Sequence, residues 1–354
     1  MLLKEKLHPI LQELADRDKF SGVILINRDN EDLFSGAYGY ASRRWRIINS
    51  TDMVYPTASV TKMFTAVAVL QLIEKGMLSL NSKVQNLLKL NVSNLPSNVT
   101  VRHLLTHTSG IADYFDETDD DADAYRNIWR RYPNYALTEL EDMLPLFAGK
   151  DPQFNAGDDF SYCNAGYILL GLVIEHVTDE SYFNCIRKNV LLEAGMKDSD
   201  FISLDRPREN VADGHSPIYS KDGSPKGWKT NIYSLPVNGS ADGGAHSTAE
   251  DLVKFLQALR TGVLLSDQMT SEILKIQSPV QEDDSGRWAY GYGIAFLLDD
   301  DEVVRYGHSG DDPGVSAKLF HYPDLDVDLV ILGNQSHCAN EAGDRVHEVI
   351  MEVG

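Results

Sequence analysis

The stretch Ala58-Ser59-Val60-Thr61-Lys62 places a hydroxyl and an amine three residues apart, at the start of an apolar segment that runs to Gly76. Residues i and i+3 share one face of a helix, so a helix that begins here would bring Ser59 Oγ and Lys62 Nζ within hydrogen-bond distance. Ser59 would lie in the first turn, where the helix dipole favours negative charge. Serine and lysine are common residues, so the spacing alone also fits an ordinary helix start with a solvated lysine.

Apolar patterns on both sides of this stretch predict strands at the two ends of the chain. Upstream, residues 2–16 carry apolar side chains at helical spacing, and the apolar runs at 22–26 and 33–40 flank a polar turn, which predicts a helix followed by a β-hairpin. The last part of the chain predicts further strands and a closing helix, at residues 290–298, 302–306, 315–321, 326–332 and 339–353. Strands at both ends imply one shared antiparallel sheet.

Between these ends the chain is predicted to be mainly helical, with unusually long loops. Helix starts are indicated at Thr100, Thr138, Asn164 and Thr248, the last with the pattern of a capping box. Long loops in a compact protein often form the walls of a site. We therefore predict an α/β (α+β) fold class: an antiparallel sheet built from both chain ends and flanked by helices, formed by residues 1–75 and 285–354, with an inserted all-helical domain at residues 76–284.

The composition argues against several classes of protein. The 354 residues include 53 acidic and 32 basic ones, and the resulting net charge of −21 at pH 7 repels nucleic acid, so we expect no nucleic-acid partner. No run of about 18 apolar residues occurs, so we expect no transmembrane segment. The N-terminus lacks the apolar core and cleavage site of a secretory signal, which predicts a cytoplasmic protein unless a leader has been removed.

Cysteines and acidic residues do not follow the patterns of a disulfide framework or a metal site. Cys163, Cys185 and Cys338 are odd in number and widely spaced, which indicates reduced thiols. The acidic run at residues 116–123 is dense in carboxylates but lacks the glycine and the terminal glutamate of an EF-hand loop. We expect no metal and no cofactor.

Two further clusters carry side chains that could enter a cleft. Tyr162 and Asn164 are two residues apart in a turn ahead of an apolar helix, so their side chains could point the same way. A packed tyrosine ring and a helix-capping asparagine are the simpler alternative. His308-Ser309-Gly310 follows a predicted strand, where Gly310 would let a ligand approach the backbone. An ordinary turn with a hydrogen-bonded histidine is the alternative there.

These clusters occur in one order along the chain together with two further motifs, at residues 104–111 (LLTHTSGI) and 243–252 (GGAHSTAEDL). The set resembles the serine β-lactamase and penicillin-binding-protein superfamily, in the branch that holds class C β-lactamases, D-Ala-D-Ala carboxypeptidases, D-aminopeptidases and related esterases. The resemblance extends from about residue 22 to residue 332 and implies a β-lactamase/transpeptidase-like fold. Five ordered motifs are more than chance spacing explains.

The resemblance implies a role for each residue of the first two clusters. Ser59 would be the nucleophile that accepts the acyl group, Lys62 its partner on the helix face, and Tyr162 the tyrosine of the family's Tyr-x-Asn motif. A serine hydroxyl needs a base to become a good nucleophile, and either Lys62 or Tyr162 could take its proton. Asn164 would hold the substrate amide and help to orient Lys62.

The third cluster would contribute to substrate binding. His308, Ser309 and Gly310 stand where the family has Lys-Thr-Gly or, in some members, His-Thr-Gly. The backbone N–H groups of Ser59 and Asp311 would stabilise the oxyanion that develops during acyl transfer. His107, in the motif at residues 104–111, is expected to be structural.

The resulting prediction is a serine hydrolase that acts through an acyl-enzyme on amide or ester bonds of D-amino-acid peptide or ester substrates. The alternatives are a carboxylesterase on the same fold, a β-lactamase, and a penicillin-sensing pseudoenzyme that acylates without turnover. Asp311 and Asp312 would repel an anionic substrate unless they point away or pair with a cation, so we expect a neutral or amine-bearing one. The expected partner is this small molecule or peptide, and the sequence indicates no particular protein partner.

Overall fold

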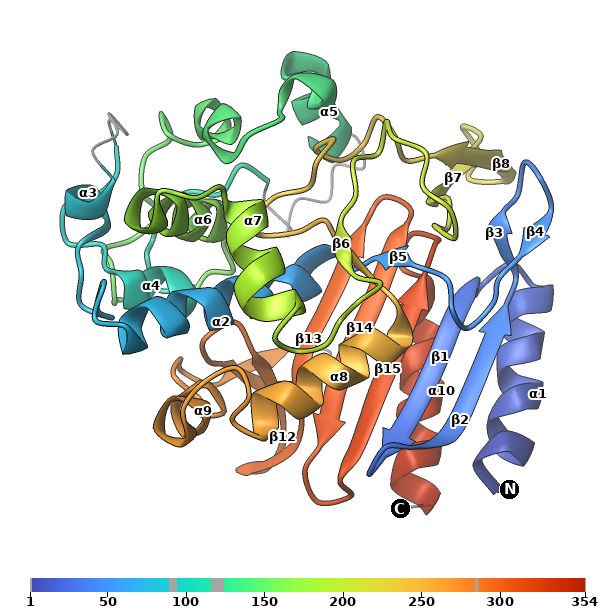
Figure 1. Cartoon of the computed structure of the whole chain (residues 1–354). Helices are drawn as coiled ribbons and strands as arrows, with labels where there is room; N and C mark the ends of the chain where they lie inside the picture. Colours follow the sequence, from blue (N-terminus) through green and yellow to red (C-terminus); the bar gives the residue numbers. More distant parts are fainter. Residues whose placement is uncertain (1, 89–93, 116–123, 284–285, 354) are drawn as a thin grey trace.

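An eight-stranded antiparallel sheet forms the centre of the computed structural model, which describes residues 2–88, 94–115, 124–283 and 286–353 (Figure 1). The strands lie in the order β10 (Gln281–Asp283), β11 (Gly286–Tyr290), β12 (Ala295–Asp299), β13 (Glu302–Asp312), β14 (Val315–Tyr322), β15 (Val327–Gly333), β1 (Gly22–Arg28) and β2 (Glu31–Tyr38). Strand β1 pairs with β15, with Val23 opposite Leu332. The two ends of the chain therefore share one sheet, and the predicted fold class is confirmed.

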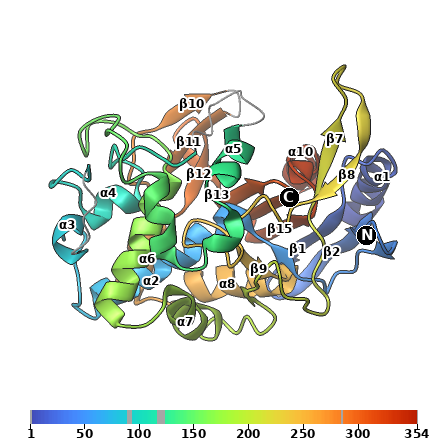
Figure 2. The same cartoon turned by 90° about the horizontal axis from the view of Figure 1, so that it is seen from above.

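Both faces of this sheet are covered. Successive side chains of β1 point to opposite sides, so they enter two separate cores. Ile24 and Ile26 pack in one core with helices α1 (Leu2–Asp16) and α10 (Cys338–Val353). Val23 and Leu25 pack in the other core, on the side of α8 (Ala249–Arg260), which contacts β1 and β15. Helices α1 and α10 contact each other on this face, and Figure 2 shows both near the two ends of the chain.

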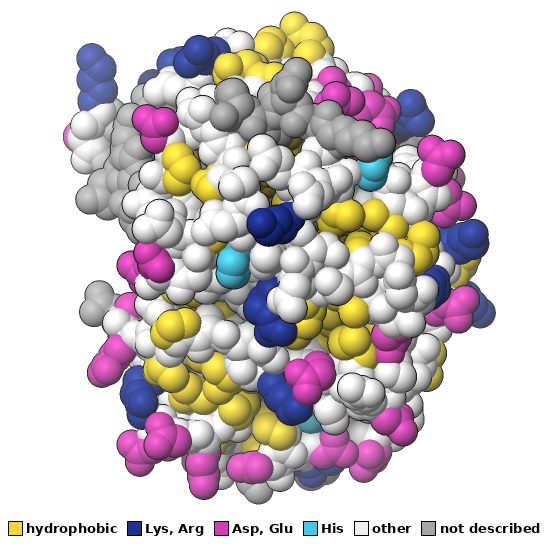
Figure 3. Space-filling model, turned by 90° about the vertical axis from the view of Figure 1, so that its left-hand side faces the viewer, with side chains coloured by type: hydrophobic (Ala, Val, Ile, Leu, Met, Phe, Trp, Pro, Cys, Tyr) yellow, Lys and Arg dark blue, Asp and Glu magenta, His cyan; other side chains and the backbone are white. Residues whose placement is uncertain are grey.

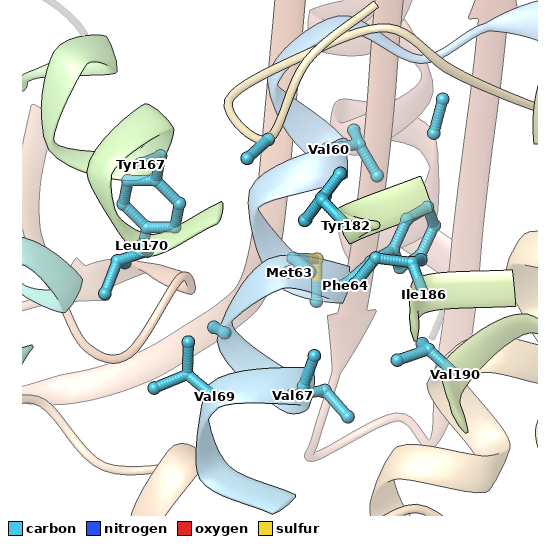
Figure 4. Close-up of a cluster of buried hydrophobic side chains, with 14 of the residues drawn as sticks. Val60, Met63, Phe64, Val67, Val69, Tyr167, Leu170, Tyr182, Ile186 and Val190 are labelled. Atoms are coloured by element: carbon cyan, nitrogen blue, oxygen red, sulfur yellow. The ribbon is translucent and has the colours of Figure 1, made fainter. Parts of the chain in front are cut away.

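Helix α2 (Thr61–Glu74) is buried on nearly all sides, which is typical of a helix inside the core rather than at the surface. Figure 4 shows its apolar side chains between two other helical segments: Tyr167 and Leu170 of α6 (Asn164–Thr178) lie on one side, and Tyr182, Ile186 and Val190 on the other. This packing fixes the helix rigidly. The residues at its N-terminus are thereby placed between the sheet and the helical part of the chain.

The helical part of the chain contains several short elements in addition to α2, α6 and α8. They are α3 (Val84–Leu87), α4 (Val101–Leu105), α5 (Ala124–Arg131), η2 (Asn134–Ala136), η3 (Leu140–Leu146), α7 (Tyr182–Ile186), η4 (Arg187–Leu191) and α9 (Asp267–Ile273). Figure 3 shows the side of the molecule formed by this part, with acidic and basic side chains interspersed over it. The division into two domains at residues 75/76 and 284/285 stays a prediction.

Two segments differ from the strands expected from the sequence. The expected strand at residues 290–298 is interrupted between β11 and β12, because Gly293 turns there with φ +72 and lies against α2. A Cβ at Gly293 would lie 2.9 Å from the backbone oxygen of Lys62. The middle segment also contains a hairpin, β7 (His215–Tyr219) and β8 (Pro225–Thr230), which is buried at the start of β7 and mostly exposed beyond it.

Short strands complete the fold around the N-terminus of α2. Strand β9 (Ala245–Ser247) lies between β5 (Tyr55–Pro56) and β6 (Asp200–Phe201), and β3 (Tyr40–Ser42) pairs with β4 (Ile47–Ile48). The acidic run at residues 116–123 lies outside the described residues. Within the described ranges, none of the helices has the length and apolar character needed to span a membrane.

Candidate active site

Ser59 lies in a strained turn rather than in a regular helix start. The 3-10 turn η1 (Ala58–Val60) leads directly into α2, and Ala58 has φ +45, a left-handed conformation that costs a non-glycine residue free energy. Side-chain hydrogen bonds hold the turn on both sides: Thr57 Oγ1 donates to the Ala245 oxygen at 2.9 Å, and Thr61 Oγ1 donates to the Ala58 oxygen at 2.7 Å. The half-buried Ser59 is therefore presented by a fixed backbone.

Strand β13 runs directly beside this turn, and Gly310 makes the close approach possible. A Cβ at Gly310 would lie 2.6 Å from the Ser59 nitrogen and 2.6 Å from the Thr57 oxygen. The predicted strand end before His308 is wrong, because β13 continues to Asp312 and pairs with β14 throughout the motif. The glycine was expected to admit a ligand, but its close neighbour is the backbone that carries Ser59.

Lys62 lies in the first turn of α2, and its side chain is fully buried. Its Nζ lies 2.9 Å from Ser59 Oγ, 2.7 Å from Asn164 Oδ1 and 2.8 Å from the backbone oxygen of Asp242. Nζ also lies 4.9 Å from the centroid of the Tyr162 ring, within the range in which a ring attracts an ammonium group. The structure thus brings together Ser59 and three residues that the sequence placed in one site.

Aromatic rings from the segment after α4 and from strand β13 lie around Tyr162. Its ring centroid lies 4.3 Å from that of His107 and 6.2 Å from that of His308. The Cys163 N–H donates to His107 Nδ1 at 3.0 Å, and burial together with the Lys62 charge holds the pKa of His107 well below its usual value. His107 therefore packs as a neutral ring that supports the Tyr162 loop.

His308 is buried, and both of its ring nitrogens have hydrogen-bond partners. Nδ1 lies 2.5 Å from the Ser309 oxygen, which can only accept, so Nδ1 carries the proton and Nε2 accepts from the Tyr290 hydroxyl at 2.7 Å. Burial and the nearby Lys62 lower the pKa of His308 to about 3. The third motif therefore supplies no positive charge near neutral pH, and a direct contact of the His308 ring with substrate stays a prediction.

The two carboxylates that follow the third motif have polar partners. Asp311 Oδ1 accepts from Ser316 Oγ at 2.7 Å and lies 3.3 Å from His337 Nδ1, and this contact raises the pKa of His337. Asp312 Oδ1 accepts from the Tyr125 hydroxyl at 3.1 Å. The charge of Asp311 is thus directed toward a histidine. Pairing with a cation is one of the two conditions under which Asp311 and Asp312 were not expected to repel an anionic substrate.

A cleft of about 1230 Å³ opens at Ser59. Its walls include aromatic and aliphatic side chains as well as carboxylates, among them Tyr114, Phe115, Tyr125, Asn164, Trp228, Leu235, Asp242, Asp311 and Asp312. Within the part of the chain that the structure describes, no group of three or more His, Cys, Asp or Glu side chains is arranged to hold a metal ion. The lining fits a partly apolar substrate.

Two features of the site were missed by the reasoning from the sequence. The backbone oxygen of Asp242 binds Lys62, but a main-chain carbonyl has no residue signature. Its position directly before Gly243 and Gly244, at the start of a motif, was the available signal. Tyr290, which fixes the tautomer of His308, lies in a strand pattern, where an aromatic residue is usually assigned to the core.

Comparison with known proteins agrees with this geometry along nearly the whole chain. Residues 8–350 match the family described as Beta-lactamase. Penicillin-binding protein 4* of Bacillus subtilis (strain 168) is 28% identical over 342 residues, which cover 94% of this chain and 72% of that protein.

Solved structures with the same fold include enzymes and penicillin-binding proteins. The crystal structure of a penicillin-binding protein from Bacillus halodurans superimposes with a TM-score of 0.87 at 38% identity, covering 98% of this chain and all of that one. The D-amino acid amidase from Ochrobactrum anthropi SV3 superimposes with a TM-score of 0.78 at 24% identity and 99% coverage of both chains. The second likeness concerns the fold.

Proposed function

The chain belongs to the β-lactamase family of serine hydrolases, and on this premise we propose that it hydrolyses amide or ester bonds through an acyl-enzyme on Ser59. The observation that carries the proposal is the 2.9 Å contact between Ser59 Oγ and the fully buried Nζ of Lys62. A serine hydroxyl held against an amine is the arrangement that nucleophilic catalysis requires.

The contacts of the Lys62 amine support a role as the base for Ser59. Asn164 Oδ1 and the Asp242 oxygen can only accept hydrogen bonds, so each takes one N–H group of the amine. A third position of the tetrahedral nitrogen faces Ser59 Oγ, and in the neutral amine it holds a lone pair. Lys62 would take the proton of Oγ as Oγ attacks the carbonyl carbon. Tyr162, beside the same amine, is the alternative base.

Backbone N–H groups next to Ser59 are suited to the next requirement, stabilising the oxyanion. We assign this role to the N–H groups of Ser59 and Asp311, because Gly310 allows β13 to lie against the Ser59 nitrogen. Losing one such donor typically costs about 3 kcal/mol of transition-state stabilisation. Collapse of the intermediate would release the amine or alcohol, which takes up the proton that the base removed from Ser59 Oγ. Water would then hydrolyse the acyl-enzyme.

The charges around the cleft support a neutral or amine-bearing substrate. His308 is neutral, so it cannot pair with a substrate carboxylate as a lysine in this position would. Asp312 lines the cleft and adds negative charge, whereas the charge of Asp311 is directed toward His337. We therefore propose D-amino-acid amides, peptides or esters with a free amine as the preferred class, and place the protein in a reducing compartment on account of its three buried free thiols.

A substrate panel tests this proposal. We expect the wild-type protein to turn over a D-amino-acid amide or a short-chain ester steadily, and Ser59→Ala to lose this activity. Ser220→Ala is a matched control that should keep it, because the side chain of Ser220 is partly exposed like that of Ser59 and does not line the cleft. Activity that survives in Ser59→Ala would refute the mechanism.

The same panel separates the alternative functions. Stronger acylation by a penicillin than by a neutral ester of similar size, measured by mass spectrometry, would refute the substrate class and favour a β-lactamase. A burst of one equivalent without turnover would favour a penicillin-sensing protein. Turnover of esters without turnover of amides would favour a carboxylesterase.

A further inference from the structure

The two fixed acceptors of the Lys62 amine belong to distant segments, yet two adjacent residues hold both of them. One acceptor is Asn164 Oδ1, at the start of α6, and the other is the backbone oxygen of Asp242. Asp113 contacts the first of these segments and Tyr114 contacts the second. Both residues follow the motif at residues 104–111 after one alanine, and no catalytic role was expected for that motif.

Asp113 holds the N-terminus of α6 from outside the helix. Its Oδ2 accepts the Asn164 N–H at 2.6 Å, and its Oδ1 accepts the Ala165 N–H at 2.9 Å. The residue in the N-cap position, Cys163, makes no side-chain capping bond, so Asp113 satisfies N–H groups that a helix start would otherwise leave open. The carboxylate thereby fixes the backbone of Asn164, whose side chain binds Lys62.

Tyr114 holds the second acceptor in a comparable way. Its hydroxyl donates to Asp242 Oδ2 at 2.7 Å, and its side chain is buried. Asp242 Oδ1 accepts from Ser240 Oγ, so both carboxylate oxygens are engaged. With its side chain fixed at both oxygens, Asp242 keeps its backbone oxygen directed at Lys62 Nζ.

We propose that Asp113 and Tyr114 form a positioning clamp that holds the two acceptors of the Lys62 amine and so directs the amine toward Ser59. The clamp rests on the proposed function, because it acts only through Lys62. Neither residue needs to touch the substrate for this role, although Tyr114 also lines the cleft.

The charged surroundings of Asp113 give the clamp a measurable pH signature. Burial raises the pKa of Asp113 to about 7, and the Asp242 charge adds to this effect. The hydrogen bonds from the N–H groups of Asn164 and Ala165 oppose it. The Lys150 ammonium bonds the backbone oxygen of Asp113 at 2.6 Å, and the Cys163 thiol and Tyr114 phenol beside it stay protonated because burial raises the pKa of each. A protonated Asp113 loses one of its two acceptor oxygens, which loosens α6.

The test compares acylation rates of Asp113→Asn and Tyr114→Phe with the wild type. A hydrogen bond to a charged group is typically worth about 10- to 100-fold in an equilibrium or rate, so we expect acylation to slow by about that factor in each variant. KM for an amide substrate should change less than kcat. Asp159→Asn is the matched control, because Asp159 is exposed. Within the described residues, its side chain accepts one hydrogen bond, from the N–H of its neighbour Phe160.

The pH profile separates the clamp from a merely structural role. In the wild type, log kcat/KM should fall as the pH drops through about 7, because a protonated Asp113 loosens α6. In Asp113→Asn this fall should be absent, so its acid limb should have a smaller slope, while Tyr114→Phe should keep the steeper limb at a lower rate.

Three outcomes decide the matter. A slower, folded Asp113→Asn with the reduced slope supports the clamp. Folded variants that acylate at the wild-type rate overturn the clamp but leave the proposed function intact, provided that wild-type acylation depends on Ser59. A wild-type protein that acylates with no substrate of the panel overturns the proposed function and the clamp with it. Tyr114→Phe changes volume little, so it tests the clamp even if Asp113→Asn fails to fold.

Discussion

Gly310→Ala is the substitution that most directly tests how β13 supports Ser59. Gly310 does not have a positive φ, so alanine fits its backbone conformation and the effect is purely steric. The added Cβ would lie 2.6 Å from the Ser59 nitrogen, whereas ordinary contacts begin at 3.4 Å, so strand and turn must separate by about 0.8 Å. Overpacking of this kind typically destabilises a protein by about 1–3 kcal/mol.

The same displacement should also slow catalysis. A displacement of about 1 Å at a reacting group costs on the order of 100-fold in rate, and here it separates Ser59 from the Asp311 N–H and from Lys62. We expect kcat/KM for a D-amino-acid amide to fall by about two orders of magnitude, in a protein that still unfolds cooperatively in urea. Gly149→Ala is the control, since its Cβ would meet nothing within 4 Å. Wild-type kcat/KM in Gly310→Ala would refute the reasoning.

Two further predictions concern stability. Arg260 forms two hydrogen bonds with the buried carboxylate of Asp328, at 2.7 and 2.9 Å. Arg260→Met should therefore lower the free energy of unfolding in urea by about 3–5 kcal/mol. Lys275→Met, which breaks an exposed pair, should lower it by less than about 1 kcal/mol, and equal losses would contradict this. Burial lowers the pKa of His215 to about 4, so its unfolded form binds a proton below about pH 6.5 while the folded form does not, and the stability it contributes is lost as the pH falls. The difference in unfolding free energy between wild type and His215→Gln should narrow by about 2 kcal/mol from about pH 7.5 to about pH 5, and a difference that stays constant over this range would contradict the argument.

The sheet could be predicted from the sequence to the extent that its strands carry continuous or alternating apolar residues. Strand β1 is buried on both faces, and its uninterrupted apolar run at residues 22–26 indicated this directly. The hairpin β7–β8 has no such pattern, since it is mostly exposed beyond the buried His215 and Ser216 and contains Pro217 and Gly227. The break between β11 and β12 depends on how Gly293 fits against α2, which is a tertiary contact without a local signal.

The site divides in the same way between what spacing predicts and what packing decides. The spacing of Ser59 and Lys62 follows from helix geometry and was found in the sequence. The tautomer of His308 depends on Tyr290, which reaches it from another strand, and the sequence could not supply that pairing. The close approach of Gly310 to the backbone that carries Ser59 is a tertiary contact without a local signal, and the expected role of Gly310 in admitting a ligand stays a prediction.

The pairing of β1 with β15 has a consequence for the synthesis of the protein. Residues that lie opposite each other in these strands are roughly 300 positions apart in the chain, and Ser59 rests on β13, about 250 positions downstream. A ribosome will have added most of the chain before these strands can meet, and contacts of such long range form slowly. Nascent chains that already contain Ser59 and Lys62 should therefore stay inert toward acylating substrates until β13 to β15 have emerged. The enzyme is thus expected to become reactive in one late step, when its sheet closes.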